Sequence, residues 1–251
     1  MGITVVKINL PDGSQKTFEG DEVPVREVVE SFGDSWKRQA VAVEFAGQLL
    51  DVHQKMSGEG DFRLLRDSDE ESLYVLRHTA AHVLAHAVQE LFPGVKFAIG
   101  PPIENGFYYD FDVETPFTPE DLERIQKKMG ELLGAGLSIS REDWDRQKAR
   151  DHFEKIGQNY KVELIDELPG NTVSVYTVGG FQDLCCGPHL DLAKRIKSYR
   201  VLSSAGAYWR GDSNKTMLQR IYATAFFKKK DLDRHLEQLE EAEKRDHRKL
   251  G

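Results

Sequence analysis

The alternation of apolar and polar residues is most regular at the start of the chain. Residues 3–10 read ITVVKINL, the pattern of a half-buried strand, and Pro11-Asp12-Gly13 supplies a turn. A helical pattern at 25–33 and two short strand patterns within 41–52 follow. We predict a small β-grasp domain over residues 1–62. It offers no nucleophile, metal cluster or phosphate loop, so we interpret it as a binding or spacing module.

A long helical pattern follows at about residues 69–92. Ser68 and Glu71 are spaced as a capping box, and Pro93-Gly94 stops the helix. At about 100° per residue, three histidines at four-residue spacing fall within an arc of roughly 80°. Apolar residues cluster on the opposite side of this helix. We therefore expect a stripe that faces a cleft or solvent and consists of His78, His82 and His86.

Strand and helix patterns are mixed beyond this helix. Asn105-Gly106 separates two strand segments, and Thr118-Pro119 opens a helix with a capping residue and a proline in its first turn. A further helix is predicted from Ser140 to about Gly157, and strand patterns occur at 172–180 and 215–226.

The last segment, 228–251, is highly charged and predicts a helix with three leucines on one side: Leu232, Leu236 and Leu239.

The predicted fold class is α+β. Its parts are a β-grasp domain at 1–62, a larger mixed α+β domain at 63–228 and a C-terminal linker helix at 229–251.

The composition, with 39% hydrophobic and 30% charged residues, is that of an ordinary globular protein. No stretch approaches a membrane span, and the start lacks the basic flank and apolar core of a signal peptide, so we expect a cytoplasmic protein without membrane contact. The two cysteines, Cys185 and Cys186, are adjacent and are expected to be reduced thiols.

The net charge of −8 argues against a surface that coats nucleic acid broadly. Any RNA contact must therefore be local. The candidates are Lys194, Arg195, Lys197 and Arg200, then Arg210 and Lys215, then Lys228, Lys229 and Lys230.

A second group of reactive side chains lies in DLCCGPH at 183–189. The Gly-Pro pair favours a turn that brings Cys185 and His189 to one side. With His78 and His82 these residues form a plausible tetrahedral zinc set, because zinc prefers neutral imidazole and thiolate ligands. The same groups can orient a water without a metal, and spacing alone leaves both alternatives open.

Five separated motifs occur in one order: RHTAAHVLAHAVQELFP at 77–93, IGPPIENGFYYDFD at 99–112, QNYKVELI at 158–165, DLCCGPHL at 183–190 and SAGAYWRGDSNKTMLQRIYATAF at 204–226. Together with the closing EEAEKRDHRKLG they resemble the amino-terminal half of bacterial-type threonyl-tRNA synthetases over essentially the whole chain. The resemblance implies a TGS domain followed by an editing domain that removes serine wrongly attached to tRNA(Thr).

The family's class II aminoacylation core is not in this sequence. We therefore expect a fragment that does not activate threonine, whose partners are the acceptor end of tRNA(Thr) carrying serine and the remainder of the synthetase, with its catalytic and anticodon domains.

The resemblance also implies roles for individual residues. His78 and His82 match the family's HxxxH pair, with His78 expected to position the water and Lys161 to assist it. In the family's DxCxxxH pattern, Asp183 is expected to bind the seryl ammonium, Cys185 to contact substrate, and His189 to move a proton or contact the ribose. Tyr108 is expected to line the pocket. Cys186 departs from the family, whose members commonly carry arginine there.

Three functions remain open at this point: a metal-free deacylase, which we favour; a zinc-dependent hydrolase on the same residues, as in the related alanyl-tRNA editing domains; and a non-catalytic module that binds the tRNA end. An editing site has a physical basis. The one methyl that separates threonine from serine is worth only about 1–3 kcal/mol in a synthetic pocket, so a second, smaller site must remove the error.

Overall fold

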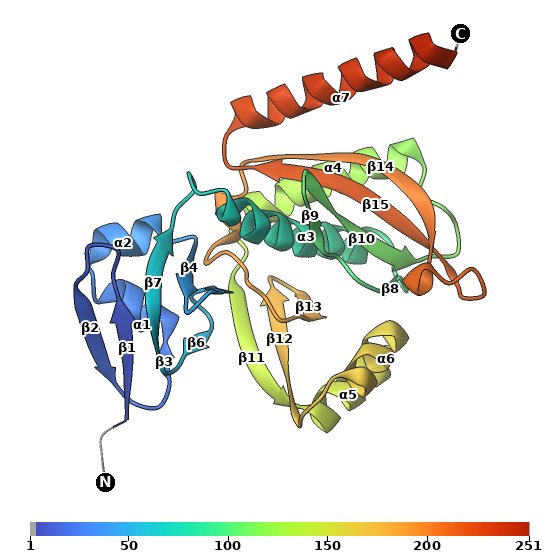
Figure 1. Cartoon of the computed structure of the whole chain (residues 1–251). Coiled ribbons are helices and arrows are strands. Elements are labelled where there is room, and N and C mark those ends of the chain that lie inside the picture. The colour runs from blue at the N-terminus through green and yellow to red at the C-terminus, as the bar shows by residue number, and fades with distance from the viewer. Residues whose placement is uncertain (1–3, 251) are drawn as a thin grey trace.

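The computed structural model describes residues 4–250, with the side chains of 246–250 excepted. Two parts lie side by side (Figure 1). The N-terminal part is a five-stranded sheet in the order β2-β1-β7-β4-β5, with β1 and β7 parallel, beside a small β3-β6 pair. Its elements are β1 (Val5–Asn9), β2 (Gln15–Glu19), β3 (Val23–Pro24), α1 (Val25–Glu30), α2 (Asp34–Gln39), β4 (Ala42–Phe45), β5 (Gln48–Leu50), β6 (Lys55–Met56) and β7 (Glu59–Leu65).

The second part holds two sheets. One has the order β14-β15-β10-β8, with β9 paired to β10, and the other is β11-β12-β13. The strands are β8 (Lys96–Phe97), β9 (Pro102–Ile103), β10 (Gly106–Asp112), β11 (Ile139–Asp145), β12 (Thr172–Val178), β13 (Phe181–Leu184), β14 (Ser198–Tyr208) and β15 (Met217–Phe226). The helices are α3 (Glu71–Leu91), α4 (Pro119–Gly134), α5 (Arg146–Lys155), α6 (Asn159–Glu167), α7 (Lys229–Leu250) and two short 3₁₀ turns at Ala193–Arg195 and Trp209–Gly211. The mixed architecture confirms the predicted α+β class.

The α3 helix is the centre of the second part. It packs against β10 and β15 on one side, and against α4, β12, β13 and the first 3₁₀ turn on others. Four alanines on α3 let these elements approach closely, and all are fully buried: Ala80, Ala81, Ala85 and Ala87. The histidines of the predicted stripe therefore do not face solvent, because His78, His82 and His86 are between 2% and 9% exposed. A helix covered on every side has no polar face to present.

The start of α3 also differs from the prediction. The helix begins after Glu70, whose side chain makes no capping hydrogen bond, so the capping box of Ser68 and Glu71 does not form. The Glu71 carboxylate pairs with Arg63 of β7 instead. The arginine offers a full charge where the cap would offer one backbone N–H.

A strand replaces the first turns of the helix predicted from Ser140. Residues 139–145 form β11, which pairs with β12 at every position and buries Trp144. Helix α5 begins only at Arg146, where Asp145 caps the free N–H groups of Gln147 and Lys148. Pairing with a neighbouring strand thus outweighs the helical pattern of this charged segment.

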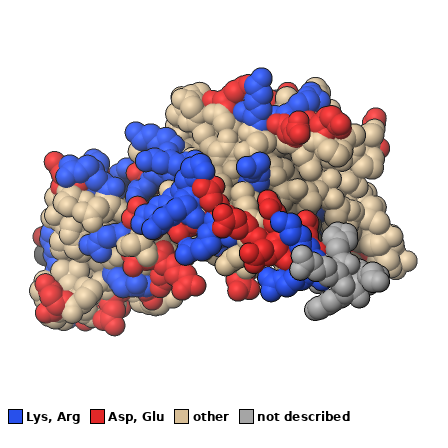
Figure 2. All heavy atoms as spheres, turned by 90° about the horizontal axis from the view of Figure 1, so that it is seen from above, with Lys and Arg blue, Asp and Glu red and all other residues tan. Residues whose placement is uncertain are grey.

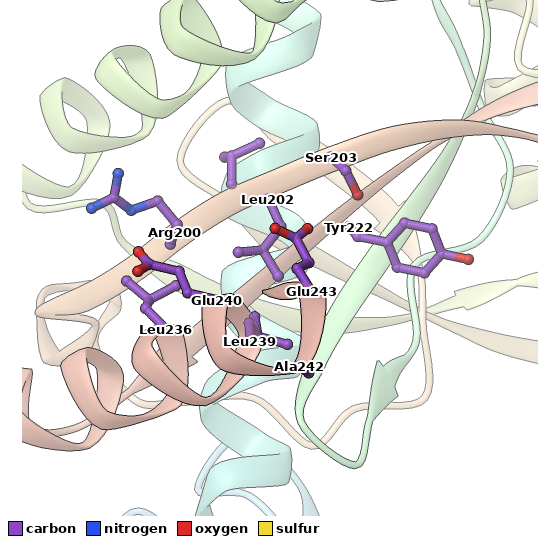
Figure 3. Close-up of a pocket in the computed structure, with 10 residues that line it drawn as sticks. Arg200, Leu202, Ser203, Tyr222, Leu236, Leu239, Glu240, Ala242 and Glu243 are labelled. Carbon is purple, nitrogen blue, oxygen red and sulfur yellow. The ribbon is translucent and has the colours of Figure 1, made fainter. Parts of the chain in front are cut away.

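The charged helix α7 lies on the opposite side of the β14-β15 sheet from α3 (Figure 1). Figure 3 shows the groove between α7 and these strands, which has a volume of about 790 Å³. Leu236 and Leu239 approach it from the helix, and Leu202 and Tyr222 from the strands. None of the expected site residues lines this groove. Within the described residues, none of the helices has the length and apolar character needed to cross a membrane.

The predicted cap of α4 is present and gives a local test of the fold. Thr118 Oγ1 accepts the Asp121 N–H, and the Asp121 side chain accepts the Thr118 N–H. Thr118→Ala is expected to cost about 1 kcal/mol in the first turn. Amide hydrogen exchange at the start of α4 should accelerate about fivefold, whereas Thr115→Ala, on the exposed preceding loop, should leave it unchanged. Equal exchange in the two variants would contradict the cap.

Candidate active site

Six of the seven expected site residues converge at the centre of the second part. Two come from successive turns of α3, one from α6, one from β13 and two from the turn that follows it: His78, His82, Lys161, Asp183, Cys185 and His189. Chain segments about a hundred residues apart therefore meet in one place.

Imidazole rings surround the Cys185 thiol. Its Sγ atom lies 3.3 Å from His78 Nε2 and 3.2 Å from His189 Nε2. The ring of His189 stacks on that of His78 and lies tilted against that of His82, with centroids 4.3 Å apart in both pairs. One potential ligand atom from each of these four residues lies within 4.8 Å of the others.

A single ion pair lies beside this group. Lys161 Nζ is 2.5 Å from Asp183 Oδ1 and also donates to the carbonyl oxygen of Ala98. The Tyr109 hydroxyl donates to Asp183 Oδ2 at 2.6 Å, and His82 Nε2 lies 3.4 Å from the same oxygen. Because Lys161 and Asp183 are almost fully buried, each needs the other to offset its lost hydration.

Burial determines the protonation of the surrounding groups. It lowers the pKa of His78 to about 3 and that of His82 to about 3, and it holds the pKa of His189 well below the usual value. Burial also raises the pKa of the Cys185 thiol, and the Asp183 carboxylate adds to that effect. At neutral pH the imidazoles are therefore uncharged and the thiol is protonated.

The hydrogen-bond partners fix which ring nitrogens carry protons. His78 Nδ1 lies 3.2 Å from the Pro188 carbonyl oxygen, which can only accept, so Nδ1 carries the proton. The Thr79 hydroxyl donates to the Val75 carbonyl, so its oxygen accepts from His189 Nδ1. The Nε2 atoms of His78 and His189 thus both carry a lone pair and can accept a hydrogen bond. The Cys185 thiol has only one proton and can donate to only one of them. The other Nε2 atom can therefore accept a hydrogen bond from water.

Tyr108 does not join the site. Its ring contacts the Arg220 guanidinium and lies across from Tyr222 on the face of the sheet toward α7. The neighbouring Tyr109 is the tyrosine that reaches Asp183 and Lys161. Since side chains alternate along a strand, Tyr109 shares the buried face with Phe107 and Phe111, and this alternation was the signal that could have identified it.

The donor set is compatible with a zinc ion. Imidazole nitrogen and thiolate sulfur are the donors that zinc prefers, and His82 Nδ1 is buried without a hydrogen-bond partner among the described residues. Two features oppose a dication. Burial favours the protonated thiol over the thiolate that zinc needs, and the Lys161 ammonium lies beside the group.

The buried histidines make stability depend on pH. The unfolded chain binds protons at these positions below pH 6.5, whereas folded His78 and His82 bind none until about pH 3. The contribution of these neutral histidines to the free energy of unfolding is therefore fully present above pH 6.5. It should fall as the pH drops toward 3, by up to about 1.4 kcal/mol per pH unit for each histidine. Urea midpoints measured between pH 7.5 and 5 should decline, and less steeply in His82→Gln. An equal decline in both proteins would contradict the neutral, buried His82.

The chain is similar to known proteins along nearly its whole length. Residues 173–222 match the family described as the threonyl and alanyl tRNA synthetase second additional domain. The chain is 50% identical over 250 residues to a threonine--tRNA ligase of Nitrosomonas europaea, covering 99% of this chain and 39% of that protein. It is 48% identical over 246 residues to the Pelobacter propionicus ligase (98% and 38%) and 49% identical over 245 residues to that of Azoarcus sp. (97% and 38%).

The chain thus spans about two fifths of the length of these relatives. Over nearly all of its own length it is a homologue of threonine--tRNA ligases, and residues 173–222 are similar to the second additional domain of threonyl and alanyl tRNA synthetases.

Proposed function

We propose that this chain hydrolyses the ester that links serine to the 3′ end of tRNA(Thr). The observation that carries the proposal is the pair of unprotonated Nε2 atoms of His78 and His189 beside a buried Lys161–Asp183 ion pair. The match to a synthetase editing domain and the threonine--tRNA ligase relatives support the substrate class.

The chemistry needs a placed water and a charge for the developing oxyanion. An imidazole with a pKa of about 3 is a weak base, so His78 orients the water more than it stores a proton. This suffices because an aminoacyl ester is already activated. The Lys161 ammonium provides positive charge for the oxyanion, and the Asp183 carboxylate provides negative charge for the seryl ammonium. His189 Nε2 is the second lone-pair acceptor beside the Cys185 thiol.

Selectivity follows from the density of the site. The His78, His82, Cys185 and His189 ligand atoms lie within 4.8 Å of one another, so little room remains for the substrate side chain. The extra methyl of threonine must displace one of these packed groups, which costs more than its apolar contact returns. Serine lacks that methyl and fits.

The basic residues supply local RNA contacts. Lysines and arginines gather over the N-terminal part and its junction with the second part (Figure 2). One groove at this junction, of about 520 Å³, is lined by five basic residues: Lys37, Arg38, Lys194, Arg195 and Lys197. Arg195 also holds the two parts together by donating to the Ala40 carbonyl. Arg210 is paired with Glu163 and Glu167, which leaves it less suited to a phosphate.

A zinc-dependent hydrolase is the second candidate, supported by the four clustered donors and the unpartnered His82 Nδ1. Three donors from among His78, His82, Cys185 and His189 would hold the ion, and one position would stay free for the water that zinc activates. In either case we propose that the chain acts together with the remaining three fifths of a synthetase, including its catalytic and anticodon domains.

The proposed hydrolysis is tested with His78→Ala and a matched control, His86→Ala. Both residues are buried on α3, but His86 lies outside the cluster and pairs with Glu90. We expect His78→Ala to slow Ser-tRNA(Thr) deacylation at least about 100-fold and His86→Ala to retain activity. Wild-type protein should cleave Thr-tRNA(Thr) far more slowly than Ser-tRNA(Thr). Equal turnover of both esters would sink the proofreading function, and tight tRNA binding without turnover would leave a non-catalytic binding module.

Metal content separates the two candidates. Protein purified without chelator is expected to contain well under one zinc per chain, because the buried thiol and the nearby ammonium disfavour the dication. Elemental analysis, with deacylation measured before and after chelation, provides the check. One zinc per chain, lost together with activity and absent from Cys185→Ser, would establish the zinc hydrolase instead.

A further inference from the structure

A loop of the N-terminal part lies against the turn that carries Cys185 and His189. This loop, residues 51–54, connects β5 with β6. His53 Nε2 donates to the Leu190 carbonyl at 3.2 Å, and Gln54 Nε2 donates to the Cys186 carbonyl at 3.4 Å. The site turn is therefore held from outside by residues that precede α3 in the chain.

The Asp51 carboxylate is the centre of this contact. It is fully buried, and its Oδ2 accepts the His189 backbone N–H at 2.6 Å and the Tyr176 hydroxyl at 2.8 Å. Its Oδ1 accepts the His53 backbone N–H at 2.8 Å. Within residues 4–245, whose side chains are described, no cationic side chain forms an ion pair with it. A buried carboxylate of this kind is tolerated only while its donors stay in place, so their positions are tightly fixed.

Asp51 acts on the His189 ring as well as on its backbone. Tyr176, held by Asp51, places its ring 4.5 Å from that of His189, whose other neighbours are His78 and His82. Gly187, two residues before His189, lies close against both Tyr176 and Asp51, so a larger residue has no room there. A Cβ there would lie 2.3 Å from Tyr176 Oη and 3.0 Å from Asp51 Oδ2, and its φ of +75° is strained for any other residue.

We propose that Asp51 is a positioning residue for the hydrolytic site. It fixes the backbone and ring of His189, and through them the Nε2 lone pair beside Cys185. The N-terminal part then contributes a residue that the site requires, in addition to any role as a binding or spacing module. The inference rests on the proposed deacylation, because the effect of Asp51 on kcat is measured in that reaction.

The first test is Asp51→Asn. Asparagine keeps one acceptor oxygen but turns an amino group toward one of the three donors, so the turn must shift. We expect kcat for Ser-tRNA(Thr) deacylation to fall about 10–100-fold, with KM changed less than threefold, because orientation is lost and substrate binding is kept. The matched control is Asp61→Asn, an exposed aspartate of β7 bonded to the Asn9 side chain, which should retain wild-type kcat.

Tyr176→Phe provides a variant that removes one hydroxyl and keeps the ring on His189. It should lower kcat in the same direction by a smaller factor, and it carries the test if Asp51→Asn does not fold. Circular dichroism and urea midpoints establish folding in each case. A folded Asp51→Asn variant with the wild-type kcat would overturn the proposal. If Asp51→Asn does not fold, a wild-type kcat in Tyr176→Phe would overturn it.

A second measurement is independent of hydrolysis. The imidazole ¹⁵N chemical shifts should change for His189 in Asp51→Asn and stay constant for His86, and neither should change in Asp61→Asn. If wild-type protein cleaves no seryl ester while the His189 signals still move, the proposed function fails and the positioning role stands. Unmoved His189 signals would overturn the positioning role whatever the activity.

Discussion

The hydroxyl of Thr79 makes the contact on which the site depends. It accepts the Leu190 N–H at 2.9 Å, donates to the Val75 carbonyl and accepts from His189 Nδ1. One side chain of α3 thereby anchors the turn after β13 and sets the tautomer of a histidine on it. This contact ties the turn that carries Cys185 and His189 to the helix that carries His78. Valine has nearly the same shape as threonine but could provide none of these bonds.

The site combines one charged pair with neutral neighbours. Burying Lys161 and Asp183 is costly, and a well-packed apolar pair would serve stability as well or better. The surrounding imidazoles stay neutral, so they add no further charge to hydrate. This arrangement suits the proposed hydrolysis because the pair offers one charge of each sign, for the substrate ammonium and for the developing oxyanion.

The sequence predicted which side chains cluster better than it predicted the elements around them. Histidine spacing and the Gly-Pro turn identified the clustered residues, since four-residue spacing on a helix is a local property. The burial of α3 was not predictable in this way, because the elements that cover it, including β10, β15 and α4, come from distant segments. The β11 strand was missed for a similar reason, since only pairing with β12 reveals it. Asp51 gave no signal at all, as its partners lie 125 and 138 residues away in the chain.

That separation of 138 residues between Asp51 and His189 has a consequence for biosynthesis. The ribosome releases the N-terminal part first, and domains generally fold as units in that order. The carboxylate is therefore already in place when the turn containing His189 emerges, and it gives that backbone N–H a partner as soon as the turn docks. Maturation of the site becomes a late docking event onto a preformed surface. A nascent chain stalled before residue 189 would hold a folded N-terminal part and an incomplete site.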